Sequence, residues 1–321
     1  MSVGHFIHLL LGTIALRPYV FLFFMAYLFG CSMQFGYKRA LLFSVAGYLI
    51  AWGSEVSSIH NGFPYGAYFY IQNTTGRELW VKGVPLMDSA SYVFLAYASY
   101  STALFAVSPR LPGREALRAP FKKLPFWDGA FLLDTWETRA LVSTRVLAAL
   151  LFVCLDIIID PVALRGGRWF LGQIYGYRSV GAYFGVPLSN FIGWAVVGYL
   201  MVWAFQGIDL LLERSFPVFG RDRYGRGLSW RFAVGPALYV SVVLFNTAVT
   251  FYIGENNIGL ADAFIMVPLA SVFLLVTRLQ IKSADEAAIN RHLRDFPGSF
   301  RRQGGEAQKT LSQGQNKSFK G

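Results

Sequence analysis

Long apolar stretches constrain this chain more than any other feature of its sequence. A helix needs about 20 mostly apolar residues to cross a bilayer. Seven stretches meet that requirement: 18–36, 39–58, 85–107, 140–160, 187–212, 231–252 and 258–281. Backbone polar groups inside a bilayer must be satisfied within the chain, so we expect these stretches to be helical. The sequence therefore predicts an all-α, polytopic transmembrane helix bundle of seven spans.

The composition supports a membrane environment. Only 15% of the residues are charged and 55% are hydrophobic, whereas soluble domains carry about 25% charged residues. The net charge of +11 comes from basic residues between the apolar stretches and in the tail, which argues against a nucleic-acid partner. Cys31 and Cys154 both lie in apolar runs and are expected to be core residues without redox function.

The two ends of the chain differ from the middle. Residues 3–16 are apolar but short, and Arg17 and Pro18 separate them from the first span. We expect an interfacial or re-entrant segment there, with an eighth span as the alternative. Residues 283–321 are polar and aperiodic, which predicts a disordered tail. The integral membrane domain is thus expected to cover 1–282.

Basic residues set the orientation. Of the 29 Lys and Arg residues, 22 lie in the turn at 36–39, the loops 108–139 and 213–231, and the chain from Arg278 onward. Short loops on the cytoplasmic side are enriched in such residues. The sequence therefore predicts a cytoplasmic C-terminal tail in the inner (cytoplasmic) membrane of a prokaryote, with the 60–84 and 161–186 loops outside.

An internal repeat relates two parts of the chain. Residues 83–88 read GVPLMD and residues 185–190 read GVPLSN, 102 positions apart. Each motif follows a span that ends in acidic residues and a loop containing Gly and Tyr. Both preceding spans run outward, so the repeat units, about 38–107 and 139–212, are expected to be parallel.

The repeat predicts a cluster of polar side chains. Glu55 and Asp156 each lie 17 residues after a basic residue that opens their span, about 26 Å along a helix. They should therefore lie at equal depth, near the outer interface. Asp88 and Asn190 each follow the repeated proline by three positions, at the start of the returning helix. We expect these four side chains to converge from four helices.

Asp160 extends this cluster. It lies four residues after Asp156 and shares its helix face. Carboxylates in membrane helices are costly and usually mark a function or a buried pair. The alternative is that Asp160 is solvated or pairs with Arg165 or Arg168.

Aromatic residues gather in the predicted outer loops: Tyr65, Tyr68, Tyr70, Trp169, Tyr175, Tyr177 and Tyr183. Tyr and Trp belts at membrane interfaces are ordinary, and that explains most of them. A subset that lined a pocket would stabilise a cation with its ring faces. His60 is expected to be a surface residue, and Asn246 and Glu255 have no partner that the sequence identifies.

Several chemistries lack their motifs. The sequence has no G-x-G-x-x-G fingerprint and no G-x-x-x-x-G-K phosphate loop. Its four histidines are scattered, and no Cys/His ligand spacing is present. We therefore expect no metal and no cofactor, and either acid–base chemistry by carboxylates or binding without chemistry.

The combined pattern resembles a known membrane family. It is similar to the carotenoid hydratases that act on acyclic end groups, of the bisanhydrobacterioruberin hydratase or γ-carotene 1′,2′-hydratase type. The resemblance covers about 40–200 and continues more weakly to about 280. It rests on Glu55 with the 62–70 loop, on GVPL at 83–86, on Asp156-x-x-x-Asp160-Pro161, and on Trp169 and the 183–194 segment that ends in Gly193-Trp194.

The resemblance implies addition of water to the terminal C=C of an acyclic carotenoid of the lycopene or γ-carotene type, giving a tertiary alcohol without a cofactor. A carboxylic acid in an apolar setting can hold and donate the proton. On physical grounds we expect Asp156 or Glu55 as donor, with the other or Asp160 activating water, and Asp88 and Asn190 orienting the groups. The expected substrate-binding residues are Asn190, Tyr65, Tyr68, Tyr70, Trp169, Tyr183 and Trp194.

Two other functions fit parts of the sequence. DIIID at 156–160 has the appearance of an aspartate-rich motif that binds Mg²⁺-diphosphate in prenyltransferases, but only one such motif is present. A carotenoid- or lipid-binding or transport protein would also use repeats that flank polar positions.

Overall fold

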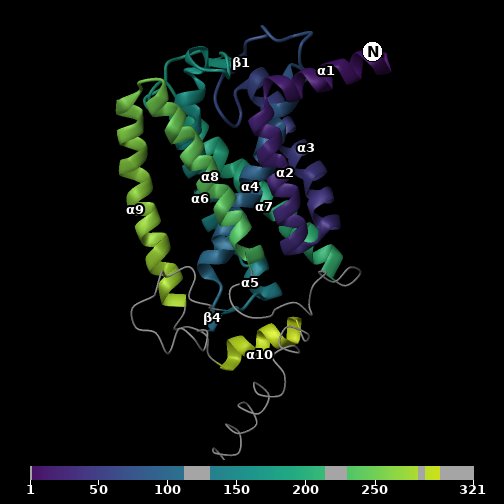
Figure 1. Cartoon of the computed structure of the whole chain (residues 1–321), viewed down its shortest axis with the longest axis vertical. Helices are drawn as coiled ribbons and strands as arrows, with labels where there is room; N and C mark the ends of the chain where they lie inside the picture. Colours follow the sequence, from purple (N-terminus) through teal and green to yellow (C-terminus); the bar gives the residue numbers. More distant parts are fainter. Residues whose placement is uncertain (1, 112–130, 214–229, 281–285, 297–321) are drawn as a thin grey trace, which may run out of the picture.

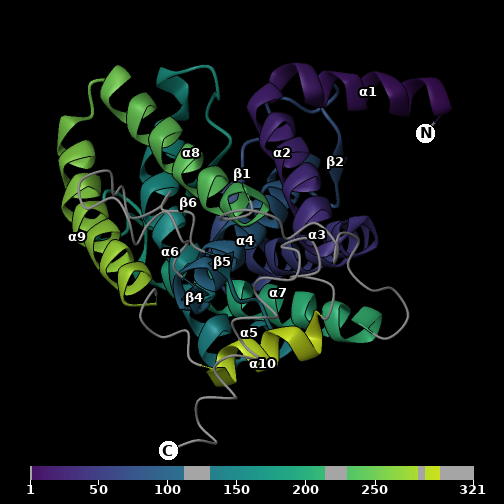
Figure 2. The ribbon, with the colours of Figure 1, turned by 60° about the horizontal axis from the view of Figure 1, so that its bottom comes forward.

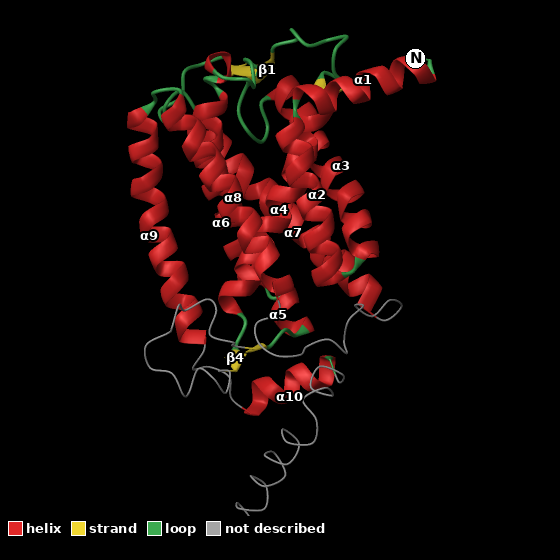
Figure 3. Cartoon of the chain, in the orientation of Figure 1, coloured by secondary structure: helices red, strands yellow, loops and turns green. Residues whose placement is uncertain are grey.

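The computed structural model describes residues 2–111, 131–213, 230–280 and 286–296. Seven long apolar helices run side by side (Figures 1 and 3), which confirms the predicted all-α bundle of seven spans. They are α2 (Pro18–Phe35), α3 (Tyr37–Asn61), α4 (Leu86–Val107), α6 (Val142–Ala163), α7 (Leu188–Glu213), α8 (Trp230–Tyr252) and α9 (Asn256–Gln280).

Shorter elements lie at the two ends of the bundle. In the described part of the chain, the short helices are α1 (Val3–Leu16), α5 (Trp136–Ala140) and α10 (Glu286–Asp295), together with the 3-10 turn η1 (Gly166–Arg168). Three antiparallel strand pairs are formed by β1 (Tyr68–Tyr70) with β6 (Tyr175–Tyr177), β2 (Trp80–Val81) with β3 (Val84–Pro85), and β4 (Arg110–Leu111) with β5 (Phe131–Leu132). We call the two ends the β1 end and the α10 end, after the elements that Figure 1 shows there.

Helix α4 is the centre of the bundle. Nearly all its side chains are buried, and it contacts α2, α3, α6, α7, α8 and α9. The helices of the two repeat units, α3 with α4 and α6 with α7, also pack on one another across the repeat. By contrast α9 lies at the edge and exposes a row of apolar side chains such as Leu260, Phe264 and Val267. Exposed apolar surface on helices of this length identifies an integral membrane protein.

Helix α1 is not a span. It has 14 residues, about 21 Å of helix, and it extends sideways from the bundle at the β1 end (Figure 1). The Thr13 hydroxyl accepts a hydrogen bond from the Leu79 backbone N–H at 2.8 Å, and buried Arg17 pairs with Glu78 at 3.6 Å. These contacts fasten α1 to the loop before α4, as expected for an interfacial segment.

Buried ion pairs organise the α10 end. Asp209 of α7 accepts from Arg39 of α3 at 2.5 Å and from Arg139 of α5 at 3.2 Å, and Arg139 also pairs with Asp134. Arg139 therefore belongs to α5, and the chain breaks at Leu141 before α6 begins. Depth along α6 therefore begins at Val142 and not at Arg139, so the predicted register of this span is corrected.

Part of the predicted disordered tail is helical. Within 283–321 the structure describes α10 and Phe296, so the prediction of disorder is corrected for this stretch, and the rest of the tail lies outside the described residues. Helix α10 lies beside α5 in Figures 1 and 2. The Trp136 N–H donates to the Asp295 carboxylate at 3.0 Å, and the His292 ring nitrogen Nδ1 lies 2.7 Å from the Asp134 carbonyl oxygen.

Candidate functional site

The repeat brings four polar side chains to the β1 end. Glu55 lies in the last turns of α3 and Asp160 in the last turns of α6, while Asp88 and Asn190 lie in the first turns of the returning helices α4 and α7. Glu55, Asp160 and Asn190 are nearly inaccessible to solvent. The sequence places them at matching positions because each unit is an outward helix, a loop and a returning helix.

The GVPL motifs form the turns that start the returning helices. Lys82 and Gly83 have positive φ angles of 53° and 84°, and Phe184 and Gly185 have 48° and 98°. Gly adopts this left-handed region readily, which accounts for its place in both motifs. In both units the valine that follows is fully buried and a proline precedes the first helical residue. The two turns therefore aim Asp88 and Asn190 in equivalent ways.

Two tyrosine pairs cover the acids. Strands β1 and β6 pair antiparallel, with Tyr68 opposite Tyr177 and Tyr70 opposite Tyr175. Alternate residues of a strand point to the same face, so the four rings share one face, and ring centroids across the ladder lie 6.1–6.4 Å apart. That face is turned toward the carboxylates.

The first set of contacts forms what we call the Glu55 half-site: Glu55, Tyr68, Tyr70 and Asp88. The hydroxyls of Tyr68 and Tyr70 both contact the Glu55 oxygen Oε2. The Tyr70 hydroxyl also contacts the Asp88 oxygen Oδ2. One tyrosine thus bridges two carboxyl groups from different helices.

The second set forms the Asp160 half-site: Asp160, Tyr175, Tyr177 and Asn190. The two tyrosine hydroxyls donate to the two Asp160 oxygens, each at 2.7 Å. The Asn190 amide donates to Asp160 at 2.8 Å and to Asp156 at 2.7 Å. The half-sites have the same plan, with a carboxylate under two tyrosines, but Asn190 occupies the place of Asp88.

This plan corrects the predicted pairing of the acids. Glu55 lies 18 residues after the first residue of α3, Tyr37, and Asp160 lies 18 residues after the first residue of α6, Val142. Asp156 lies one turn, about 6 Å, further from the β1 end. The counterpart of Glu55 is therefore Asp160 and not Asp156.

The tyrosines keep their protons. Burial raises the pKa of the Tyr68, Tyr70, Tyr175 and Tyr177 hydroxyls well above the ordinary value, and the neighbouring carboxylates raise it further. All four therefore act as hydrogen-bond donors to the carboxylates at physiological pH.

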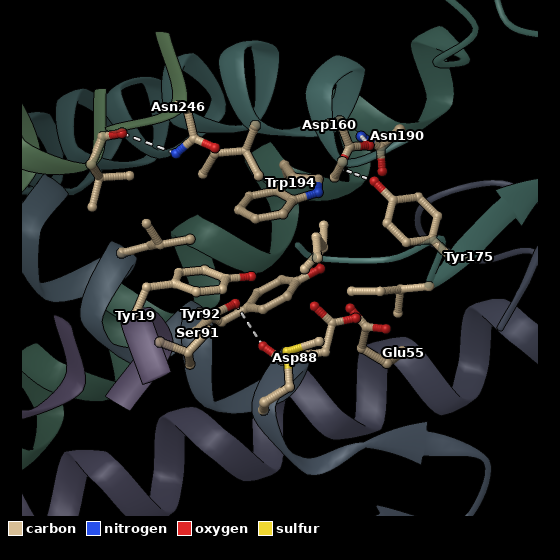
Figure 4. Close-up of a pocket in the computed structure, with 18 of the residues that line it drawn as sticks. Tyr19, Glu55, Asp88, Ser91, Tyr92, Asp160, Tyr175, Asn190, Trp194 and Asn246 are labelled. Atoms are coloured by element: carbon tan, nitrogen blue, oxygen red, sulfur yellow. Dashed lines mark hydrogen bonds between the residues drawn. The ribbon is translucent and has the colours of Figure 1, made fainter. Parts of the chain in front are cut away.

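A pocket of about 120 Å³ opens between the half-sites. Figure 4 shows Glu55 and Asp88 on one side, Asp160 with Asn190 on another, and the rings of Tyr92 and Trp194 between them. Those two rings are stacked with centroids 4.5 Å apart. Away from the acids the pocket continues along apolar side chains of α2, α4 and α8: Val20, Phe23, Phe94, Leu95, Val242 and Phe245.

Most of the predicted site residues line this pocket. These are Glu55, Asp88, Asp160, Asn190, Tyr65, Tyr68, Tyr70, Trp169 and Trp194. Asp156 is fully buried behind Asn190, whose amide donates to it at 2.7 Å, and it also contacts the Asp160 carboxyl group. Tyr183 lies outside the pocket lining and packs on Phe184 and Phe191.

The other predicted contacts are resolved in different ways. Arg165 and Arg168 both pair with Glu255, and the Arg165–Glu255 distance is 3.1 Å. These two arginines are therefore the partners of Glu255 that the sequence did not identify. Neither of them pairs with Asp160. His60 is exposed, as expected. Asn246 lines the apolar arm of the pocket (Figure 4) and donates to the Val242 carbonyl at 2.9 Å.

Four pocket tyrosines were missing from the predicted site: Tyr19, Tyr92, Tyr175 and Tyr177. A signal for the last two was present, because Tyr-x-Tyr occurs at 68–70 and again at 175–177, at corresponding places in the two units. Tyr92 gave no such signal, since it lies within an apolar helix where a tyrosine is an ordinary core residue.

Fold and site together define a polytopic membrane protein with a buried carboxylate–tyrosine pocket at one end of its bundle. Residues 4–269 match the family model described as carotenoid biosynthesis protein, and the chain belongs to that family. No curated protein and no solved structure matches the chain. Its place is therefore in a carotenoid pathway, within a lipid bilayer.

Proposed function

We propose that this protein is a carotenoid hydratase, a hydro-lyase that adds water to the terminal C=C of an acyclic carotenoid end group of the lycopene or γ-carotene type. The observation that carries the proposal is the pair of tyrosine-bound carboxyl groups, Glu55 and Asp160, on one pocket that also has an aromatic wall and an apolar arm. Family membership supplies the carotenoid context.

Hydration of such an alkene needs one acid and one base. A carboxylic acid transfers its proton to the less substituted alkene carbon, whose new C–H bond takes the π electrons, and a tertiary cation remains. Ring faces such as those of Tyr92 and Trp194 stabilise that cation. Water then bonds to the cation and gives its proton to a carboxylate, so the sum is addition of one water. Positioned acid–base groups typically contribute about 10²–10⁴-fold to the rate.

The shape of the pocket suits one end of a long apolar substrate. A volume of about 120 Å³ has room for several waters or for a small end group, and a whole carotene is far larger. The apolar arm between α2, α4 and α8 would guide the polyene toward lipid, while its tip lies between the carboxyl groups. The acids lie at the β1 end of the bundle, close to the loops, where we expect water to enter.

The prenyltransferase alternative finds no support in the site. A diphosphate would be bound through Mg²⁺ held by the aspartates, and no Lys or Arg is among the described residues that line the pocket to add a side-chain cation. Asp156 and Asp160, the ends of the aspartate-rich motif, are engaged by Asn190 and by tyrosines.

The test is expression in a host that makes lycopene, with products identified by mass. Wild-type protein should yield products heavier by one water per hydrated end. Glu55→Gln and Asp160→Asn should each lower product formation by about 10²-fold or more. Glu137→Gln, the same chemical change at an exposed position near the α10 end, should not. Unhydrated carotenoid that co-purifies with wild-type protein, with no product, would instead indicate a binding or transport protein.

A further inference from the structure

The two half-sites differ in how many hydrogens their contacts require. In the Glu55 half-site, the Tyr68 hydrogen is used by Glu55. The Tyr70 hydroxyl contacts both Glu55 and Asp88, but a hydroxyl has a single hydrogen to donate. If both carboxyl groups were ionised, one of these contacts would set two lone pairs against each other. A proton on Glu55 or Asp88 removes the conflict, because that carboxyl then donates to the Tyr70 oxygen.

The Asp160 half-site has no such shortage. Asp160 and Asp156 together receive four contacts, two from tyrosine hydroxyls and two from the Asn190 amide. Two hydroxyl hydrogens and two amide hydrogens supply all four. Asp160 is thus fully satisfied as an ionised carboxylate.

The difference comes from one pair of equivalent residues. Asp88 and Asn190 occupy the same place in the repeat, three residues after the motif proline. An amide at this place brings its own hydrogens, whereas a carboxyl brings a second acceptor and so requires a proton. Asp156 lies outside the pocket lining and contacts the Asp160 carboxyl group. A proton held by Asp156 and donated to Asp160 satisfies this contact and leaves Asp160, the group that lines the pocket, ionised.

We infer a division of labour between the half-sites, which rests on the proposed function: the Glu55–Tyr70–Asp88 bridge holds the proton that is given to the substrate, and Asp160 is the ionised base that takes the proton from water. Asp88 is the residue that distinguishes the acid side from the base side. After one turnover the bridge has lost one proton and Asp160 has gained one, so the resting state returns when that proton passes back or exchanges with water.

The experiment is infrared difference spectroscopy of purified protein in H₂O and D₂O, which does not depend on turnover. Wild type should show the C=O stretch of a hydrogen-bonded carboxylic acid that shifts in D₂O. Asp88→Asn, which copies the residue found at position 190, should remove this band, and so should Glu55→Gln. Asp160→Asn should keep it. Asp156 is a second buried acid that could carry a proton, so Asp156→Asn is the control. This variant should leave the band of the Glu55–Asp88 bridge in place and remove at most a different band, that of Asp156 itself.

Two further variants make the result decisive. Asp88→Glu should keep the band, and Tyr70→Phe, which keeps the ring, should move it toward the frequency of a weakly hydrogen-bonded acid. A band that survives both Asp88→Asn and Glu55→Gln, or that disappears only in Asp156→Asn, overturns the inference. The expected bands in a protein that makes no hydrated product would overturn the proposed function and leave the location of the proton standing.

Discussion

At the residue scale, the notable feature is that the pocket carboxylates are held by tyrosine hydroxyls and an amide. Within the described part of the chain, no Lys or Arg is among their hydrogen-bond or ion-pair partners; Arg165 and Arg168, which follow Asp160 in the sequence, pair with Glu255 instead. A cation beside the acids would favour their ionised form. Neutral donors fix the position of a carboxyl group while leaving it able to hold a proton, which is what an acid catalyst requires.

Gly193 of α7 packs closely against the loop that contains Pro64 and Tyr65. A Cβ at Gly193 would lie 2.6 Å from the Tyr65 ring and 2.7 Å from the Pro64 carbonyl oxygen. We expect Gly193→Ala to displace this loop and to reduce product formation at least about 10-fold, because catalytic geometry tolerates little misplacement. Gly207→Ala on the same helix meets nothing within 4 Å and should leave activity unchanged. Equal activity of the two variants in the lycopene-producing host would contradict this account.

At the element scale, the site is made by two helix–loop–helix units that lie against each other. Each unit supplies a carboxylate on its outward helix that is held by two tyrosines, the strand that carries those tyrosines, and one GVPL turn, and the β1–β6 ladder joins the two loops. Neither unit forms the pocket alone. The opposite end is fastened differently, by the ion pairs around Asp209 and by the docking of α10 on α5.

Loss of the Asp209 carboxylate should weaken the packing of the helices at the α10 end. It holds buried Arg39 and Arg139, which come from different helices. Removing one partner of a buried ion pair typically costs about 3–5 kcal/mol, because a buried charge is left uncompensated. Asp209→Ala should therefore lower the thermal unfolding temperature in detergent far more than Glu213→Ala, at the last residue of the same helix. Similar unfolding temperatures would show that the ion pairs contribute little.

The docking of α10 should depend on pH. Burial lowers the pKa of the His292 imidazole below its ordinary value, although the Asp134 carbonyl and the carboxylates of Asp134 and Asp295 oppose the shift, and Arg139 adds to it. The docked state therefore favours the neutral ring. The contribution of the neutral His292 ring to the docking of α10 is complete above the undocked pKa of about 6.5. It is lost as the pH falls from there toward the lowered pKa of the docked ring.

Hydrogen exchange of the α10 amides measures this effect. After correction for the intrinsic pH dependence, protection should fall between about pH 8 and about pH 5, the range in which a histidine changes charge. His292→Asn cannot titrate and keeps a nitrogen donor near the place of Nδ1, so its protection should not change over this range. A wild-type protein whose α10 is equally protected at both values would refute the assignment to His292.

At the scale of the whole molecule, orientation determines which compartment supplies water to the pocket. Seven spans place the two ends of the bundle on opposite sides of the membrane. In the sequence, most Lys and Arg residues lie in the segments that adjoin the α10 end of the spans and in the C-terminal tail, so by the positive-inside rule we expect that end to be cytoplasmic. On that expectation, the pocket at the β1 end opens on the side of the membrane away from the cytoplasm.

Reporter fusions test this orientation. A reporter that works only in the cytoplasm should give a signal when it is fused after residue 296. A reporter that works only outside the cytoplasm should give a signal when it is inserted in the 72–77 loop, between β1 and β2. Active reporters with the reverse pattern would place the pocket on the cytoplasmic side, and the proposed chemistry would then draw on cytoplasmic water.

The sequence by itself determined the number of spans, the repeat and the residues at the β1 end, because bilayer thickness fixes span length and a repeated motif implies repeated geometry. It could not give the register between the units. That depends on the break at Leu141, which the ion pairs of Arg139 with Asp134 and Asp209 stabilise through contacts distant in the chain. Only the tertiary structure made Asp160 the counterpart of Glu55, because it shows that the two tyrosines of the second loop donate to Asp160 and not to Asp156.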